Sequence, residues 1–129
     1  MPLDKDARAE ELAAAVVDAA IKVHKALGPG LLESVYEACL AHELGLRGIP
    51  VKRQLVLPVT YEGMTLETGL RIDMLAGDCV IVELKSVDTL LPVHQSQLIT
   101  YLKLSGLNLG LLINFNVRML RDGLKRIVL

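Results

Sequence analysis

The spacing of hydrophobic residues predicts two amphipathic helices in the first third of the chain. Within residues 4–27, apolar side chains recur every three or four positions, with Glu, Asp and Lys between them. This is the periodicity of a helix that buries one face. Residues 28–30, Gly-Pro-Gly, end that helix, and a second helix is predicted at 31–46. Its buried stripe would consist of Leu32, Val35, Cys39 and Leu40.

Alternation of apolar and polar residues then predicts three antiparallel strands. They are expected at residues 54–60, 65–75 and 79–84, with turns at 61–64 and 76–78. Pro58 cannot donate a hydrogen bond to a neighbouring strand, so the first strand is expected at a sheet edge or at a bulge.

The last third of the chain predicts one more helix and at least one more strand. Pro92 suits the first turn of a helix over residues 91–105, and Gly106 ends it. Residues 107–115 are nearly all apolar, which is typical of a short strand covered on both faces, and residues 125–129 are a candidate edge strand. The order predicts a single α/β domain over residues 1–129, with helices flanking a mixed sheet.

Composition excludes several classes of protein. The 129 residues are 52% hydrophobic, enough to bury a core without disulfides or structural metals. Fourteen Lys and Arg against fifteen Asp and Glu give a net charge of −1, which argues against coating nucleic acid by bulk charge. Two sets of bases could form a local basic patch: Arg47, Lys52, Arg53 and Arg71, or Arg118, Arg121, Lys125 and Arg126. The alternative is that these scattered bases only keep the surface soluble.

Neither the cysteines nor the beginning of the chain suggests export. Cys39 and Cys79 lie 40 residues apart in no metal-binding or redox motif, and we expect buried free thiols. The N-terminus alternates acids and bases, unlike a signal peptide. The longest apolar runs fall short of the ~20 residues that a membrane span needs. We therefore expect a cytoplasmic protein with no membrane segment.

Two carboxylates are predicted to meet on one sheet face. Matching the apolar faces of the second and third strands requires Met74 opposite Val82, which places Asp73 beside Glu83. A three-residue loop at 77–79 gives that register. Side-chain alternation also assigns Ile72 and Met74 to one face of their strand.

Lys85 is expected on the same face as Glu83, because the two are separated by one residue in a strand. Carboxylates directly across a strand pair repel each other unless a cation lies between them. Lys85 supplies part of that charge, and Mg²⁺, which prefers oxygen ligands, would supply more. The alternative is a solvated charged face of an amphipathic sheet.

These residues resemble a known signature. Asp73 followed by Glu83-Leu84-Lys85 on successive strands is similar to the D…(D/E)xK motif of the PD-(D/E)XK nuclease superfamily, whose restriction-endonuclease-like core has the order helix, three strands, helix, strand. Here an extra N-terminal helix precedes it. Residues 10–129 further resemble the GxxExxY family, through Gly30-Leu-Leu-Glu-Ser-Val-Tyr36 and the blocks at 81–106 and 110–116.

The resemblance implies roles for particular residues. Asp73, Glu83 and the backbone carbonyl of Leu84 would hold Mg²⁺ or Mn²⁺, and Lys85 would orient or activate the attacking water. Glu33 resembles the superfamily's helical acid, which orients that water or assists a second ion.

Two positions on the helix after the third strand complete the comparison. Gln97 resembles the glutamine often found on that helix. The family commonly carries an acid where this chain has Gln95, which argues against a second metal ion.

Helical spacing allows both flanking helices to face the carboxylates. The two faces consist of Glu33, Tyr36 and Glu37, and of His94, Gln97 and Tyr101. Each residue also has a structural interpretation: Glu33 suits the helix dipole, the tyrosines suit half-buried packing, Gln97 suits an exposed surface, and His94 suits a structural role at a helix start.

Three functions follow, in order of preference. The first is a Mg²⁺-dependent nuclease that hydrolyses phosphodiester bonds of DNA or RNA. The second is a non-catalytic module on the same fold that binds nucleic acid or protein and works as a homodimer or adaptor. The third is a metal-dependent hydrolase of a smaller phosphorylated compound, which would suit the neutral net charge.

Overall fold

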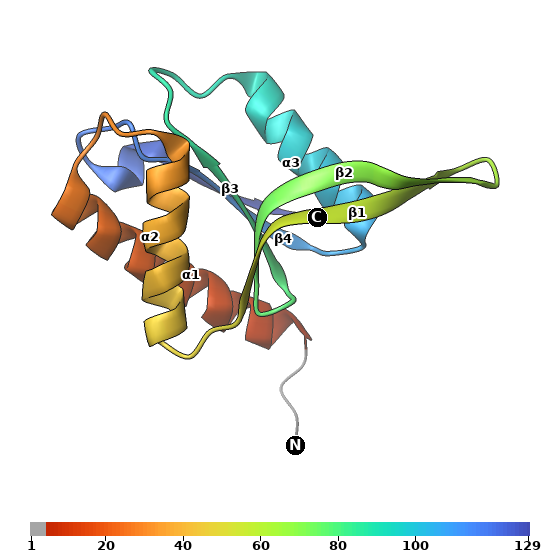
Figure 1. Ribbon diagram of the computed structural model, residues 1–129, viewed down its shortest axis with the longest axis horizontal. Coiled ribbons are helices and arrows are strands. Elements are labelled where there is room, and N and C mark those ends of the chain that lie inside the picture. Colours follow the sequence, from red (N-terminus) through yellow and green to blue (C-terminus); the bar gives the residue numbers. More distant parts are fainter. Residues whose placement is uncertain (1–4) are drawn as a thin grey trace.

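The computed structural model describes residues 5–129 (Figure 1). Its elements are α1 (Lys5–Leu27), α2 (Glu33–Leu46), β1 (Val51–Tyr61), β2 (Met64–Ala76), β3 (Val80–Lys85), α3 (Pro92–Ser105), β4 (Leu109–Asn114), the 3-10 helix η1 (Leu120–Gly123) and β5 (Leu124–Val128). Each predicted helix and strand is present, with ends shifted by a few residues. The predicted start of the first helix at residue 4 lies outside the described residues.

The strands form one mixed sheet in the order β1-β2-β3-β4-β5. Among the described strands only β3 and β4 pair in parallel, because α3 connects them by a crossover. Figure 1 shows α1 and α2 on one side of the sheet and α3 on the other. β1 lies at an edge of the sheet, and its ladder with β2 is irregular between Leu57 and Val59. Pro58 therefore lies both on an edge strand and at an irregularity of the ladder, the two positions that were predicted for it.

Two hydrophobic cores lie on opposite sides of the sheet. The larger packs α1 and α2 against the sheet and includes Val16, Leu40, Met74, Val82, Leu111 and Phe115. The smaller lies under α3 and consists of Leu70, Ile72, Leu75, Ile81, Leu98, Leu102 and Leu112. Because helices cover both faces, all six residues of β4 are buried, as its continuous apolar run predicted.

The buried face of α2 differs from the predicted stripe. Leu32 precedes the helix and is 74% exposed, and Val35 is also exposed. The buried residues are Tyr36, Glu37, Leu40 and Leu44. Tyr36 decides this rotation, because its ring stacks on Phe115 with centroids 4.5 Å apart and buries more surface than either aliphatic side chain.

The two cysteines are free but only half-buried, so the expectation of buried thiols was wrong. Cys79 lies in the loop between β2 and β3 and packs, partly buried, against the larger core. Its Sγ accepts a hydrogen bond from Arg8 Nη1 at 3.5 Å.

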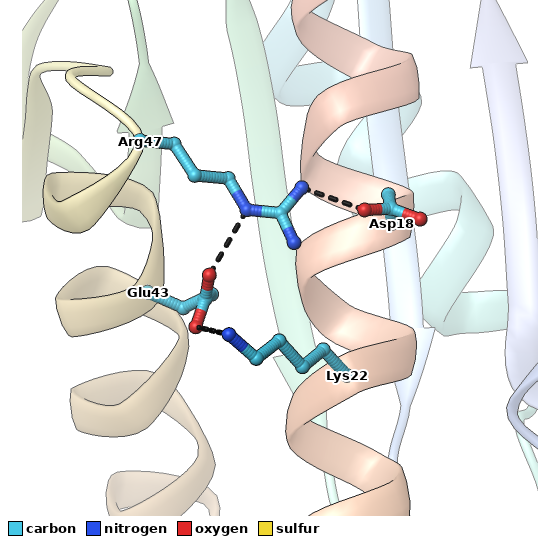
Figure 2. Close-up of polar contacts among 4 residues, drawn as sticks. All are labelled: Asp18, Lys22, Glu43 and Arg47. Atoms are coloured by element: carbon cyan, nitrogen blue, oxygen red, sulfur yellow. Dashed lines mark hydrogen bonds and ion pairs between the residues drawn. The ribbon is translucent and has the colours of Figure 1, made fainter.

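An ion-pair network joins the exposed surfaces of α1 and α2 (Figure 2). Arg47 Nη1 lies 2.7 Å from Asp18 Oδ2 and Arg47 Nε lies 3.0 Å from Glu43 Oε2. Lys22 Nζ lies 3.0 Å from Glu43 Oε1. The hydrogen bond from Lys22, followed by that from Arg47, lowers the pKa of Glu43. The network therefore links the two helices and neutralises Arg47.

The outer part of the β1–β2 hairpin projects beyond the body of the molecule (Figure 1). Residues 61–69 are all exposed. Tyr61 pairs with Met64, and Val59 pairs with Leu66, so one side of this projecting arm is apolar. The same stripe continues inward to the core under α3, where Leu57 packs against the cluster and pairs with its member Leu70.

Candidate functional site

Asp73 and Glu83 lie opposite each other where the β2–β3 ladder ends. The last backbone pair is Met74 with Val82, and the loop between the strands is residues 77–79, both as predicted. Beyond that pair, side chains replace the ladder: Leu84 N donates to Asp73 Oδ2 at 2.9 Å, and Asp73 N donates to Glu83 Oε1 at 3.1 Å. Each carboxylate is therefore held by the backbone of the neighbouring strand.

Glu83 is a buried acid with an unusually high pKa. Its side chain is 4% exposed. Burial, and next the negative charge of Asp73, raise the pKa of Glu83 to about 8, against the hydrogen bond from Asp73 N and the positive charge of Lys85. Without an added cation, Glu83 therefore holds a proton at neutral pH.

Lys85 ends β3 on the side of the strand that carries Glu83. It is half-buried, and its carbonyl accepts a hydrogen bond from Phe115 N at 3.0 Å. Asn114, its neighbour on β4, fixes the segment that follows, because its amide bonds both the N–H and the carbonyl of Val87. Among the described residues, Lys85 forms no direct ion pair, so its ammonium is available to a ligand.

The sheet changes its pleat at Asp73, which corrects one expectation. Ile72 packs under α3, whereas Met74 packs on the side of α1 and α2, so they do not share a face. The opposite residue, Gln54, has φ +50°, and the β1–β2 pairing passes from Arg53–Met74 to Leu55–Ile72 without a pair between Gln54 and Asp73. A residue with positive φ departs from the extended conformation of a regular strand, so the pleat is interrupted at this position of the ladder.

Helix α3 contributes to the site through Tyr101. Burial raises the pKa of this half-buried tyrosine, and the charges of Glu83 and Asp73 raise it further, while a hydrogen bond with Gln97 acts in the opposite direction. Gln97 itself is exposed. His94 has the structural role: its Nδ1 accepts a hydrogen bond from Leu91 N at 2.9 Å at the start of the helix.

Helix α2 contributes less to the acidic pair than predicted. Tyr36 is fully buried, its hydroxyl donates to Gly28 O at 2.6 Å and accepts from Leu31 N, and Glu37 binds residues of β1. Neither side chain therefore faces Asp73 and Glu83, because the rotation of α2 turns both toward other partners.

Glu33 lies at the start of α2 and is exposed. This helix start approaches the end of β3, where Ser86 Oγ donates to Leu31 O at 2.6 Å. Within residues 5–129, no three or more His, Cys, Asp or Glu side chains gather as a metal cluster, so Glu33 does not join the acidic pair. Its position in the first turn also fits the helix dipole.

The donor atoms of the acidic pair suit a hard cation. The two backbone hydrogen bonds use Asp73 Oδ2 and Glu83 Oε1 and not the second oxygen of either carboxylate. Mg²⁺ is commonly bound by one or two carboxylates, with waters and substrate phosphates as its remaining ligands. A site with two carboxylates fits this pattern, and a dedicated all-protein cage is not required.

The first predicted basic patch is largely neutralised. Arg47 pairs with two acids, Lys52 Nζ lies 3.2 Å from Asp78, and Arg53 binds Glu37. Arg71 is exposed, and in the part of the chain that the structure describes it forms no ion pair.

The second patch keeps most of its charge. Arg126 is bonded to Glu10, but no ion pair involves Arg118, Arg121 or Lys125 within the described chain. Arg118 and Arg121 follow β4, which leaves the sheet beside Lys85. This segment therefore places free positive charge toward the end of the sheet where β3 ends.

Comparison with known proteins identifies the family. A family model described as the PD-(D/E)XK nuclease superfamily matches residues 10–127, and the chain belongs to this superfamily. The mixed sheet with helices on both sides is consistent with its restriction-endonuclease-like fold. No curated protein and no solved structure matched the chain. Within residues 5–129, no helix has the length and hydrophobicity that crossing a membrane requires.

Sequence reasoning did not anticipate the role of Gln54. A left-handed glutamine within a strand has no local signal, because Gly and Asn are the usual residues there. The only available indication was that Gln54 interrupts the alternation by following two basic residues, Lys52 and Arg53.

Proposed function

We propose that this protein is a divalent-metal-dependent nuclease in which Asp73, Glu83 and the carbonyl of Leu84 hold Mg²⁺ or Mn²⁺. The observation that carries the proposal is the buried acidic pair, in which Glu83 retains a proton because burial, and next the charge of the adjacent Asp73, raise its pKa. A bound divalent ion would compensate both charges, and it supplies Lewis-acid stabilisation of a phosphoryl group and a lower pKa for water. Family membership supports the same assignment.

The residues around the pair have complementary roles. Lys85 carries a positive charge on the Glu83 side of β3, where it would donate a hydrogen bond to the attacking water or to the scissile phosphate. Gln97 and Tyr101, which bond each other on α3, would contact the substrate beside the carboxylates. Glu33, at the start of α2, would bind water at the rim of the site.

Three finer assignments belong to the same proposal. The chain would be a member of the GxxExxY branch, because its motif at residues 30–36 supplies Tyr36, whose hydroxyl holds the Gly28–Leu31 turn. It would act in the cytoplasm as a single domain over residues 1–129. Its substrate would be DNA or RNA, held partly by Arg71, Arg118, Arg121 and Lys125.

Metal binding and cleavage test the proposal together. Titration calorimetry with Mn²⁺ is expected to give one site in the wild type and none in Asp73→Ala. A panel of single- and double-stranded DNA and RNA is then incubated with Mg²⁺, Mn²⁺ or EDTA. Cleavage is expected with either metal only, and Lys85→Ala should remove it without abolishing Mn²⁺ binding. Glu67→Ala, an exposed acid on β2, is the matched control and should behave like the wild type.

Other outcomes separate the competing functions. Absence of Mn²⁺ binding and of cleavage, or cleavage that survives Lys85→Ala, overturns the nuclease. Turnover of mononucleotides or dinucleotides while polymers stay intact would identify a small-substrate hydrolase instead.

The projecting arm favours the second candidate, a non-catalytic homodimeric binding module. Tyr61, Met64 and Leu66 are 68%, 53% and 51% exposed along one apolar stripe, and a two-stranded ribbon is only marginally stable in water on its own. Sedimentation equilibrium tests this candidate. It predicts a dimer that Tyr61→Ser with Leu66→Ser converts to a folded monomer, and salt-dependent nucleic-acid binding without turnover.

A further inference from the structure

We propose that Glu37 is a positioning residue for Asp73. Its carboxylate holds Gln54 in the left-handed conformation, and this interrupts the β1–β2 ladder at the point where Asp73 must reach toward β3. The relevance of this arrangement to catalysis rests on the proposed function. The arrangement itself is a property of the metal-free protein and is measured there.

One carboxylate engages two consecutive residues of β1. Glu37 is 8% exposed. Its Oε2 accepts from Arg53 Nε at 3.2 Å and from Arg53 Nη2 at 3.0 Å, and its Oε1 accepts from Gln54 Nε2 at 2.6 Å. Both oxygens are therefore occupied, and the buried charge is compensated by a guanidinium and an amide.

Consecutive residues in a regular strand cannot both reach the same helix, because their side chains point to opposite faces. Arg53 and Gln54 do so because Gln54 has φ +50°. A residue with a Cβ rarely adopts this conformation without compensation. The hydrogen bond from Gln54 to a buried carboxylate, stronger than one between neutral groups, supplies that compensation.

The interruption extends across the ladder to Asp73. Gln54 and Asp73 occupy equivalent positions between the pairs Arg53–Met74 and Leu55–Ile72, but they do not pair. A residue in a regular ladder holds its side chain roughly perpendicular to the sheet. Asp73 instead accepts from Leu84 N, within the adjacent strand. Release from β1 gives Asp73 the freedom to make this contact, which fixes one carboxylate of the acidic pair.

Amide hydrogen exchange at Leu84 tests the inference in the metal-free protein. Leu84 N–H donates to Asp73 Oδ2, so its exchange rate reports the position of that carboxylate. In Glu37→Ala we expect exchange at Leu84 at least about tenfold faster, the effect of losing a hydrogen bond to a charged group. The amide of Leu111, in the core of β4, serves as the reference for any global loss of stability.

Substitutions at Gln54 separate conformation from simple packing. Gln54→Val should raise the exchange rate at Leu84 as strongly as Glu37→Ala, because a β-branched residue disfavours positive φ. Gln54→Gly should leave it near the wild-type rate, because glycine adopts positive φ freely. The double variant Glu37→Ala with Gln54→Gly should restore protection, although the contact with Arg53 is still lost.

A control at another left-handed residue completes the design. Glu62, at the tip of the arm, has φ +48°, and Glu62→Val should strain the turn without changing exchange at Leu84. If Glu37→Ala and Gln54→Val both leave Leu84 as protected as in the wild type, relative to Leu111, the inference is overturned. Failure of the double variant to restore protection overturns it as well.

Mn²⁺ affinity then connects the arrangement to the proposed function. We expect Glu37→Ala to weaken Mn²⁺ binding by about 10- to 100-fold, the range for residues that support metal ligands, and the double variant to recover it. If the wild type binds no Mn²⁺, the proposed function fails, but the exchange result at Leu84 still decides the inference. An unchanged Mn²⁺ affinity in Glu37→Ala, with faster exchange at Leu84, would overturn its relevance to the metal site.

Discussion

Two buried glutamates in this small protein have opposite surroundings. Glu37 on α2 is 8% exposed and receives hydrogen bonds from a guanidinium and an amide. Glu83 on β3 is 4% exposed and lies beside Asp73, whose charge, after burial itself, raises its pKa to about 8. Burial is similar, but the neighbours differ. The first carboxylate already has its cation, and the second retains a proton that the proposed metal ion would replace.

The largest expected difference is in metal binding and cleavage. Glu83→Gln keeps the size of the side chain but removes the anionic ligand, so Mn²⁺ affinity and cleavage should each fall by more than about 100-fold, beyond the loss typical of residues that only support a ligand. Glu37→Gln retains a carbonyl acceptor for Gln54, and we expect a loss of less than about tenfold. Calorimetry and a cleavage assay measure both. Equal losses in the two variants would remove the distinction between these glutamates.

The pH dependence of stability is the second test. Because the pKa of Glu83 in the folded state lies above the unfolded value, folded protein binds a proton that unfolded protein has released. The free energy of unfolding should therefore fall as pH rises from about 5 to 8, by up to about 1.4 kcal/mol per pH unit. Urea titrations at several pH values give the free energy of unfolding of the wild type and of Glu83→Gln. The contribution of Glu83 is the difference between the two variants in how steeply this free energy changes with pH. The same pH dependence of the free energy of unfolding in both variants would contradict the raised pKa of Glu83.

Divalent metal should reverse that trend. Mn²⁺ must displace the proton from Glu83, so binding is expected to release about one proton near pH 7 and to tighten as pH rises. The melting temperature at fixed Mn²⁺ should then increase more at pH 8 than at pH 6. Calorimetry in two buffers with different ionisation enthalpies counts the protons. Binding that is independent of pH would show that the ion lies elsewhere.

The smallest effects are expected at the two arginines that pair with carboxylates of α2. Arg47→Ala removes the centre of the network in Figure 2, but Asp18 is exposed to solvent and Glu43 keeps its ion pair with Lys22, so the loss of stability should be slight and should shrink as salt rises. Arg53→Ala should lower the stability of the fold more than Arg47→Ala does, because it leaves Glu37 buried without its cation. This loss should depend little on salt concentration. Thermal melts at two salt concentrations compare the variants, and a larger effect for Arg47→Ala would reverse the ranking.

The local sequence pattern was sufficient to predict the register of β2 and β3 that brings Asp73 and Glu83 together. Alternation fixed which residues of β2 and β3 share a side near the hairpin, and the three-residue loop fixed Met74 opposite Val82, so Asp73 and Glu83 became neighbours by sequence alone. These features depend on contacts between residues close in the chain. Their geometry follows from the period of a strand and the length of its turn.

Only the tertiary structure decided which side chains on the helices serve the site and where the sheet changes its pleat. The ring of Tyr36 on Phe115 set the rotation of α2, which turned Glu37 toward β1 instead of toward Asp73. Glu37 in turn stabilises a left-handed Gln54 that its own sequence does not favour. Such choices join residues far apart in the chain, and their energy depends on burial and on the partner present, which no local periodicity encodes.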